Sequence, residues 1–136
     1  MAHYLLDACA LLIIFNGEPG AHKVLDLLEQ ARAGKIRLSM SIVQLLEVYY
    51  DRIYVAGVDN ARTVIESIIA EPITIIESIS YAVMYEAGRF KTSYSMSLAD
   101  AFAAATAKNL SATLVTKDNE LKAAEDAGEF SILWLK

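Results

Sequence analysis

The chain has 136 residues, 55% of them hydrophobic and 21% charged, and a formal net charge of −5 at pH 7. This length predicts one domain over residues 1–136, the hydrophobic content excludes a disordered chain, and the negative charge excludes a broad polyanion-binding surface. The single cysteine excludes a disulfide within the chain, and together with only two histidines it excludes a Cys- or His-rich metal site. No apolar run approaches the roughly 18–20 residues of a membrane span. A reducing cytoplasm is the expected setting.

Short apolar segments of strand length alternate with helical patterns along the chain. In the first half we expect a strand at 4–6, helices at 9–15 and 19–33, a strand at 36–40, and helices at 42–56 and 59–71. In the second half we expect a strand at 73–76, helices at 80–90 and from 97 onward, a strand at 113–116, a helix at 119–127 and a strand at 132–135. Strands separated by helices predict an α/β fold with a mostly parallel sheet.

The helix that Ser41 caps is predicted to have two distinct faces. Its apolar face is expected to hold Ile42, Leu45, Leu46 and Tyr49. On the opposite side, at helical spacing, are Gln44, Glu47 and Asp51. This second side fits a solvated surface, and it also fits part of a functional site.

Four carboxylates are placed where a parallel sheet would gather them: Asp7, Glu47, Asp100 and Asp118. Each one alone also fits a structural role. Asp7 and Asp118 fit helix caps or turns, Asp100 fits a capping-box-like pair with Ser97, and Glu47 fits a solvated face. In an open α/β sheet the helix N-termini gather at the carboxyl edge of the strands, so all four acids can face one cleft.

Several carboxylates in one cleft repel each other and raise each other's pKa, and a divalent cation relieves this repulsion. Ligation by oxygen alone favours a hard ion, Mg²⁺ or Mn²⁺. Such an ion can activate water and stabilise charge on a phosphodiester. A nucleophilic Ser/His or Cys/His set is a weak competitor, because neither His3 nor His22 lies in a recognisable motif.

Four short segments carry or flank these acids: 4–12 (YLLDACALL), 16–20 (NGEPG), 97–101 (SLADA) and 114–118 (LVTKD). In their order and spacing, and with Glu47 between them, they resemble the PIN-domain ribonucleases, most closely the small VapC-type toxins. The resemblance covers essentially the whole chain. No single segment is specific, and the weight rests on their combination.

This resemblance implies a PIN-like three-layer α/β/α fold with a five-stranded sheet in which the first and fourth strands are neighbours. It matches Asp7, Glu47, Asp100 and Asp118 to the family's catalytic and metal-binding quartet, and Thr116 to a hydroxyl residue that often orients the quartet. Glu120, two residues after Asp118, fits a fifth acid that supports the quartet, and it also fits an ordinary charge in the first turn of a helix. The implied activity is Mg²⁺- or Mn²⁺-dependent endonucleolytic cleavage of RNA by metal-activated water. The implied role is that of a cytoplasmic toxin, usually a homodimer, whose antitoxin partner covers the acidic cleft.

The chain departs from the family pattern directly after its first aspartate. The family usually has hydroxyl residues there, commonly Thr-Ser, whereas this chain has Ala8 and Cys9. A hydrogen bond that orients Asp7 can therefore be missing, and such losses cost roughly 10–100-fold in metal affinity or activity. Cys9 is interpreted preferentially as a small buried apolar residue, and alternatively as a weak substitute donor.

An acidic nuclease must bind RNA through local positive charge. The candidates near the expected cleft are Lys117 and Arg52, and Tyr94 is a candidate platform for stacking an unpaired base. Each of the three also fits an ordinary role, as a solvated charge or as a packing aromatic. Tyr49, Tyr50 and Tyr54 fit either an exposed surface for a partner or core positions.

Two alternative functions stay open. The first is a PIN-like module with a degraded site that only binds RNA or a protein partner, which Ala8 and Cys9 would favour. The second is a nuclease outside a toxin–antitoxin system that processes RNA or acts on DNA, because it would carry the same quartet. An aspartate phosphotransferase is disfavoured, since its second aspartate would stand where this chain has Cys9.

Overall fold

A computed structural model describes residues 1–136, and its centre is one sheet of five parallel strands. The strands are β1 (His3–Leu6), β2 (Arg37–Ser41), β3 (Thr74–Ile76), β4 (Thr113–Thr116) and β5 (Ile132–Trp134), in the order β3-β2-β1-β4-β5. Every neighbouring pair is parallel, with Leu6 beside Met40 on one side and Val115 on the other. The predicted five-stranded parallel sheet is confirmed, and β1 and β4 are neighbours as expected.

Seven α-helices connect and cover the strands: α1 (Ala8–Phe15), α2 (Ala21–Arg32), α3 (Ile42–Ala56), α4 (Val58–Ile69), α5 (Tyr81–Ser93), α6 (Leu98–Leu110) and α7 (Lys122–Asp126). A 3₁₀ turn, η1 (Asn119–Leu121), precedes α7. The segment predicted as one helix over 119–127 therefore begins differently. The Asp118 carboxylate accepts a hydrogen bond from the Glu120 backbone N–H and tightens this first turn.

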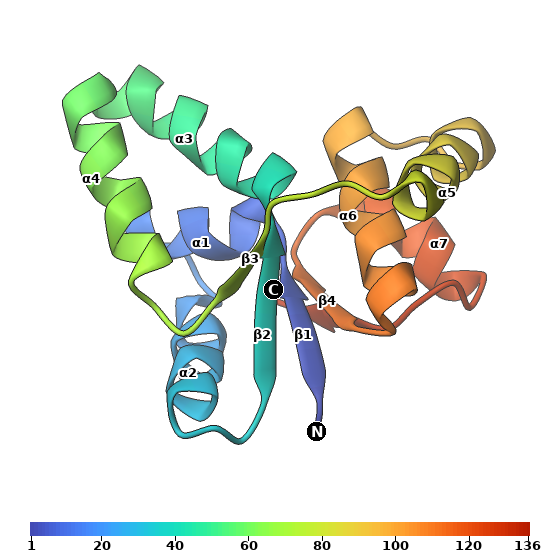
Figure 1. Cartoon of the computed structure of the whole chain (residues 1–136), viewed down its shortest axis with the longest axis horizontal. Coiled ribbons are helices and arrows are strands. Elements are labelled where there is room, and N and C mark those ends of the chain that lie inside the picture. The colour runs from blue at the N-terminus through green and yellow to red at the C-terminus, as the bar shows by residue number, and fades with distance from the viewer.

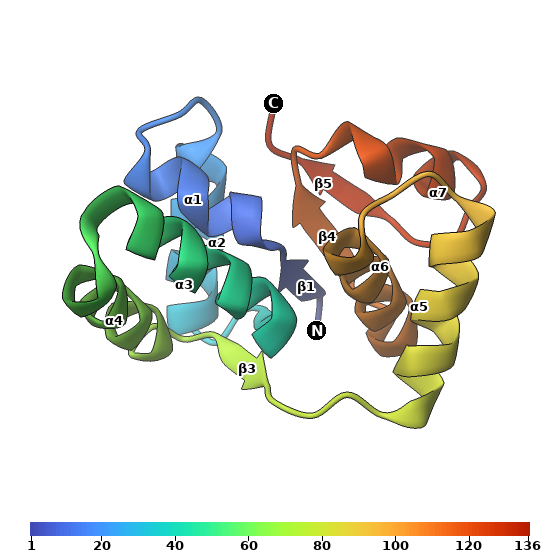
Figure 2. The ribbon, with the colours of Figure 1, turned by 90° about the horizontal axis from the view of Figure 1, so that it is seen from above.

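The helices form two layers, one on each face of the sheet. Helices α1 to α4 lie on one side of the central strands and α5 to α7 on the other (Figures 1 and 2). Successive strand residues point to opposite faces, so Leu6 packs into the core beneath α1 to α4, whereas Leu5 packs with α5 and α6. The three-layer α/β/α architecture is confirmed.

Helix α3 does not bury the face that the sequence predicts. Ile42 and Leu46 are 40% and 56% exposed, while Gln44 is only 1% exposed. Leu45 and Val48 are the residues of α3 that pack into the core. The prediction is confirmed for Leu45 and wrong for Ile42 and Leu46, because α3 packs on its helical neighbours and extends beyond the sheet, where α4 runs beside it (Figure 1).

The connections bring the acidic residues to one edge of the sheet. Asp7 directly follows β1 and caps α1, and Asp118 follows β4 two residues after Thr116. Asp100 lies in the first turn of α6, whose N-terminus faces the same edge. No helix in the chain combines the length and the apolarity that crossing a bilayer requires.

Candidate metal centre

An acidic pocket of about 220 Å³ opens where α1, α3 and α6 meet the ends of β1 and β4. Its walls are formed by Asp7, Ala8, Cys9, Leu12, Gln44, Glu47, Tyr50, Asp51, Asp100 and Asp118. The pocket therefore brings together all four acids of the predicted quartet. It contains a fifth carboxylate, that of Asp51, and its lining includes no lysine, arginine or histidine.

Asp7 is the most enclosed of these acids, with 3% of its surface exposed. Its Oδ1 accepts hydrogen bonds from the Ala10 backbone N–H at 3.1 Å and from the Cys9 thiol at 2.9 Å. Its Oδ2 accepts a hydrogen bond from the Thr116 hydroxyl. Burial raises the pKa of Asp7, and the hydrogen bonds from Cys9, Thr116 and Ala10 oppose that rise because they favour the carboxylate. Asp7 is thus fixed in orientation by three donors.

Cys9 supplies the donor that the missing hydroxyl residues would have provided. Besides donating to Asp7, its sulfur accepts a hydrogen bond from the Lys117 backbone N–H at 3.3 Å. Burial, followed by the nearby Asp7 charge, raises the pKa of the thiol, so the proton that it donates is retained. The preferred interpretation of Cys9 as a merely apolar residue is wrong, because its position between β4 and Asp7 gives the thiol two polar partners.

Three carboxylates form a tighter group inside the site. Oxygen atoms of Asp100, Asp118 and Glu120 all lie within 4.8 Å of one another. Thr116 connects this group to Asp7, because its hydroxyl oxygen also accepts a hydrogen bond from the Asp118 backbone N–H at 3.0 Å. Of the two interpretations of Glu120, this grouping supports the fifth acid, because the 3₁₀ turn brings its carboxylate to the Ser97 backbone N–H at the start of α6.

Asp100 is the acid in this group that most needs a cation. It is 6% exposed, and its Oδ2 is buried without any hydrogen-bond partner. Burial raises the pKa of Asp100, and the Asp118 carboxylate raises it further. The Ser97 hydroxyl caps α6 by accepting from the Asp100 backbone N–H, and the Ser97 backbone N–H donates to Glu120 Oε2 at 2.9 Å. A buried carboxylate oxygen left unpaired is costly unless a cation or proton neutralises it.

Glu47 faces the pocket from α3, outside the tight group of three. Its side chain is half-buried, and Tyr50 Oη donates to its Oε2 at 3.4 Å. Burial raises the pKa of Glu47, with further contributions from the charges of Asp7 and Asp118. Glu47 is therefore not part of a fully solvated face, because it lines the pocket and the negative charges of Asp7 and Asp118 act on its carboxylate.

The two candidate cations for RNA lie outside the pocket lining. Lys117 Nζ donates to Glu18 Oε1 at 2.7 Å and so connects β4 to the loop after α1. The Arg52 guanidinium lies over the Phe15 ring, 5.5 Å from its centroid. Both side chains are only partly buried; Lys117 directly follows β4, and Arg52 lies on α3.

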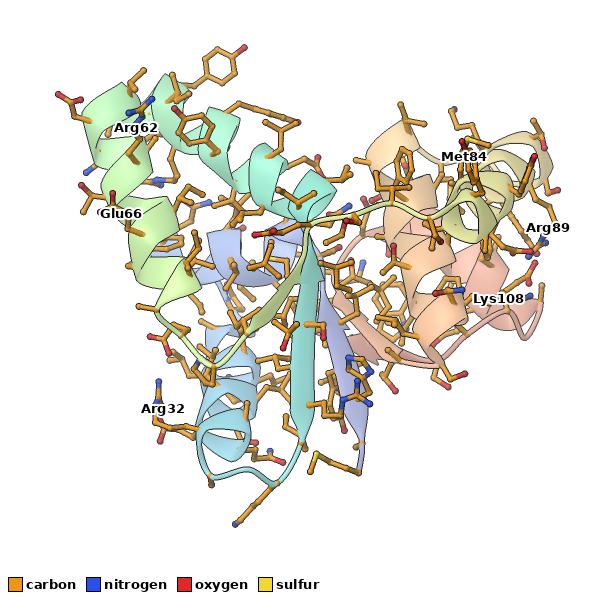
Figure 3. The ribbon with its side chains drawn as sticks, viewed as in Figure 1. Arg32, Arg62, Glu66, Met84, Arg89 and Lys108 are labelled. Atoms are coloured by element: carbon orange, nitrogen blue, oxygen red, sulfur yellow. The ribbon has the colours of Figure 1, made fainter.

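Tyr94 is occupied by contacts within the fold. Its ring stacks on Phe90 with centroids 5.8 Å apart, and its hydroxyl donates to Glu129 Oε2 at 2.8 Å. Arg89 and Lys108, which Figure 3 labels on the α5 and α6 side of the molecule, hold the same Glu129 carboxylate. Tyr94 does not line the acidic pocket, and these contacts match its packing role rather than a platform for RNA bases.

Gln44 is the residue of the site that sequence reasoning missed. The sequence places it on the same side of the helix as Glu47 and Asp51 and gives it no role of its own, whereas the structure buries it in the pocket wall. The only signal in the sequence is its place three residues before Glu47, on the same side of the helix. That spacing does not predict that α1 and α6 pack against Gln44 and bury it.

The chemistry of the donors fits a hard divalent cation. Every candidate ligand is a carboxylate oxygen, one of them buried and unpaired, and no positive side chain lines the pocket to balance the charge. Oxygen-only sites of this kind select Mg²⁺ or Mn²⁺ over softer metals. The arrangement can therefore bind a divalent ion beside a surface open to solvent.

Comparison with known proteins adds a family and a fold. The sequence model of the PIN domain matches residues 4–127. No protein of curated function matches the chain in sequence.

Among solved structures, VapBC2 from Rickettsia felis bound to a promoter DNA fragment aligns with a TM-score of 0.76 and 18% identity, over 96% of this chain and 97% of that chain. DNA-bound VapBC from Salmonella typhimurium aligns with a TM-score of 0.73 and 15% identity, over 100% of both chains. FitAcB from Neisseria gonorrhoeae aligns with a TM-score of 0.67 and 17% identity, over 97% of both chains. At these identities the likeness shows the shared fold.

Proposed function

The chain belongs to the PIN-domain family, and on that premise we propose that it is a Mg²⁺-dependent endoribonuclease that acts as the toxin of a VapBC-type pair. The observation that carries the proposal is the pocket in which Asp7, Glu47, Asp100 and Asp118 converge without any compensating positive side chain. Mn²⁺ is expected to substitute for Mg²⁺, because both are hard ions that accept carboxylate ligands.

The residues of the pocket divide the work. Asp100, Asp118 and Glu120 would hold the ion together with Asp7, whose carboxylate is aimed by its three donors. When bound, a divalent ion lowers the pKa of water and stabilises the charge that develops on a phosphodiester. Glu47 lines the same pocket, and burial raises its pKa, which would suit its carboxylate to take a proton from water.

The substrate and the partners are part of the same proposal. Lys117 directly precedes Asp118 and Arg52 directly follows Asp51, so both remain the candidates for the local positive charge that an RNA backbone needs. Structures with this fold include complexes described as VapBC and as a toxin–antitoxin complex from Klebsiella pneumoniae, which supports an antitoxin partner. Tyr50 and Tyr54 are 45% and 86% exposed and contact each other edge to face, as expected for a surface that an antitoxin or a second protomer covers.

The alternative of a degraded, non-catalytic site loses the observation that favoured it. Ala8 and Cys9 replace the expected hydroxyl residues, but the Cys9 thiol donates to Asp7 in their place. A nuclease that processes RNA outside a toxin–antitoxin system would use the same pocket. We prefer the toxin, because several structures with the same fold are those of toxin–antitoxin complexes.

The test is cleavage of single-stranded RNA by the purified protein in Mg²⁺, in Mn²⁺ and in EDTA. Asp100→Asn should abolish cleavage, because it removes the carboxylate with the unpaired oxygen. Asp59→Asn is the matched control, since Asp59 also lies in the first turn of a helix, α4, but is exposed and far from the pocket in the chain. Metal-dependent cleavage that survives in Asp100→Asn would refute the site.

The toxin role needs its own assay. Induced expression in a bacterial host should arrest growth, and Asp100→Asn should relieve the arrest. Metal-dependent cleavage in the test tube without any effect on growth would favour the RNA-processing alternative instead.

A further inference from the structure

Gln44 is a buried polar side chain in the wall of the acidic pocket to which the proposed reaction gives no task. It is 1% exposed and lies on α3 one turn before Glu47. Its amide is fully used: Oε1 accepts from the Ala8 backbone N–H at 3.0 Å, and Nε2 donates to the Ala99 carbonyl at 2.8 Å. Both partners are backbone groups of other helices.

These two backbone partners are the immediate neighbours of two candidate ligands. Ala8 directly follows Asp7 at the start of α1, and Ala99 directly precedes Asp100 in the first turn of α6. The helix that carries Gln44 also carries Glu47. One amide group therefore joins the three helix segments that present these three acids.

The connection also joins the two layers of the fold. Helices α1 and α3 pack in the core on one face of the sheet, and α6 packs in the core on the other (Figure 2). No other hydrogen bond joins α3 to α1 or to α6. Gln44 is therefore the one side chain that links α3 by hydrogen bonds both to the start of α1, next to Asp7, and to the start of α6, next to Asp100.

A glutamine is chemically suited to this task in a way that its substitutes are not. It carries a donor and an acceptor on one planar group, whereas ionised glutamate lacks the donor and methionine has no donor and only a weak acceptor. Asparagine is one methylene shorter and cannot span the same two partners. An apolar residue would fill the volume but would leave the Ala8 N–H, which has no acceptor within its own helix, buried and unpaired.

We propose that Gln44 is a positioning residue that sets the separation of Asp7 and Asp100, and thereby the affinity of the site for a divalent ion. The inference rests on the proposed function, because it assumes that these acids hold the ion. Gln44 itself contributes no ligand. Its loss should weaken ion binding through the acids that it holds apart.

The first measurement is Mn²⁺ affinity without RNA, followed by the electron paramagnetic resonance signal of free Mn²⁺. Gln44→Met, which keeps the length and volume of the side chain, should weaken Mn²⁺ binding about 10-fold or more. Val48→Ala is the control for general destabilisation, because Val48 is a buried core residue of the same helix that does not line the pocket. Val48→Ala should lower the melting temperature and leave the Mn²⁺ affinity within twofold of the unmodified protein.

The second measurement is amide hydrogen exchange without metal. Gln44→Met should accelerate exchange at the Ala8 amide and in the first turn of α6 more than elsewhere, whereas Val48→Ala should show no such concentration. A folded Gln44→Met protein with unchanged Mn²⁺ affinity and unchanged exchange at Ala8 would overturn the proposal.

Two further outcomes remain decisive. If the unmodified protein binds no Mn²⁺, the proposed function fails, and the exchange pattern alone decides whether Gln44 holds α1 to α6. If Gln44→Met does not fold, Gln44→Glu keeps the acceptor for Ala8 and loses only the donor to Ala99. It should bind Mn²⁺ more weakly despite its added negative charge, and equal or tighter binding would contradict a positioning role.

Discussion

Asp100→Asn is expected to stabilise the metal-free protein, although it should abolish the proposed activity. Asp100 is buried, its Oδ2 has no partner, and oxygens of Asp118 and Glu120 lie within 4.8 Å. In the absence of a cation, the folded state must either ionise Asp100 against these neighbours or hold a proton on it. The asparagine side chain in Asp100→Asn is neutral, so neither ionisation nor a bound proton is needed, and its NH₂ group is a hydrogen-bond donor toward the same carboxylates.

The magnitude follows from the spacing of the carboxylates. Two unit charges 4.8 Å apart repel by about 3.5 kcal/mol at an effective dielectric constant of about 20. Asp118 is only partly buried and Glu120 is exposed, so solvent weakens both interactions. We expect Asp100→Asn to raise the free energy of unfolding by about 2–4 kcal/mol at pH 8, which for 136 residues is an increase in melting temperature of roughly 7–14 °C.

The sign of the pH dependence is fixed by the direction of the pKa change. Burial and Asp118 raise the pKa of Asp100 above its value in the unfolded chain, so the folded state binds more protons. The contribution of Asp100 to the stability of the metal-free protein must then fall as pH rises above about 4, where the unfolded carboxyl loses its proton. The advantage of Asp100→Asn should be absent near pH 4 and should grow toward pH 8.

The assay is calorimetric unfolding in EDTA from pH 4 to pH 8, and then with saturating Mn²⁺. Mn²⁺ should stabilise the unmodified protein and leave Asp100→Asn nearly unchanged. Asp59→Asn, the same chemical change in the first turn of α4, should cost a few tenths of a kcal/mol, because it removes a favourable charge at a helix N-terminus. A lower melting temperature for Asp100→Asn at pH 8, or a gain that does not vary with pH, would refute the reasoning.

Three further substitutions test other parts of the structure. Cys9→Ala should weaken Mn²⁺ binding about 10–100-fold in titration calorimetry, because Asp7 loses a hydrogen-bond donor. Cys9→Ser keeps a donor and should bind Mn²⁺ about as tightly as the unmodified protein. Equal affinities of the two variants would contradict this role of the thiol. Glu129→Gln should lower the melting temperature at pH 7 and lose that effect as pH falls through about 2, because Arg89 lowers the pKa of Glu129 to about 2. Gly20→Ala should destabilise the protein in urea titration, because φ is +100° there and a Cβ atom would lie 2.0 Å from the Leu135 carbonyl oxygen; an unchanged midpoint would contradict that clash.

The acids at strand ends were predictable from the sequence because their placement is topological. A parallel sheet brings the carboxyl ends of its strands to one edge, and this holds for Asp7 and Asp118 whatever the details of packing. Asp100 follows the same logic, since the first turn of a connecting helix lies at that edge. A short motif and an approximate strand boundary are enough for such a prediction.

The burial of residues on α3 could not be predicted in this way. Helical periodicity shows which residues share a side but not which neighbour covers that side. Gln44 is buried because α1 and α6 approach it from different layers, and Leu46 is exposed because α3 extends beyond the sheet. The burial of Gln44 and the exposure of Leu46 both depend on how α3 packs against other elements, and the sequence of α3 alone does not predict that packing.

Cys9 shows the same limit at the level of a single atom. The sequence shows that the hydroxyl residues are replaced, and a small buried apolar residue is the ordinary interpretation of a lone cysteine. The thiol donates to Asp7, two residues before it, and the end of β4 adds the Thr116 hydroxyl and the Lys117 backbone N–H as further polar partners. The identity of the residue alone does not show these contacts, which depend on how the end of β4 packs against the start of α1.

The acidic pocket places the stability of the fold and the proposed activity in opposition. The carboxylates gather where the two helix layers meet, so their repulsion acts directly across that junction. Thr116 and Cys9 donate hydrogen bonds to Asp7, and Gln44 donates to the Ala99 carbonyl of α6. These bonds stabilise the junction but add no positive charge. A bound cation would therefore stabilise the protein and complete the site at once, and neutralising a single acid should separate these two effects.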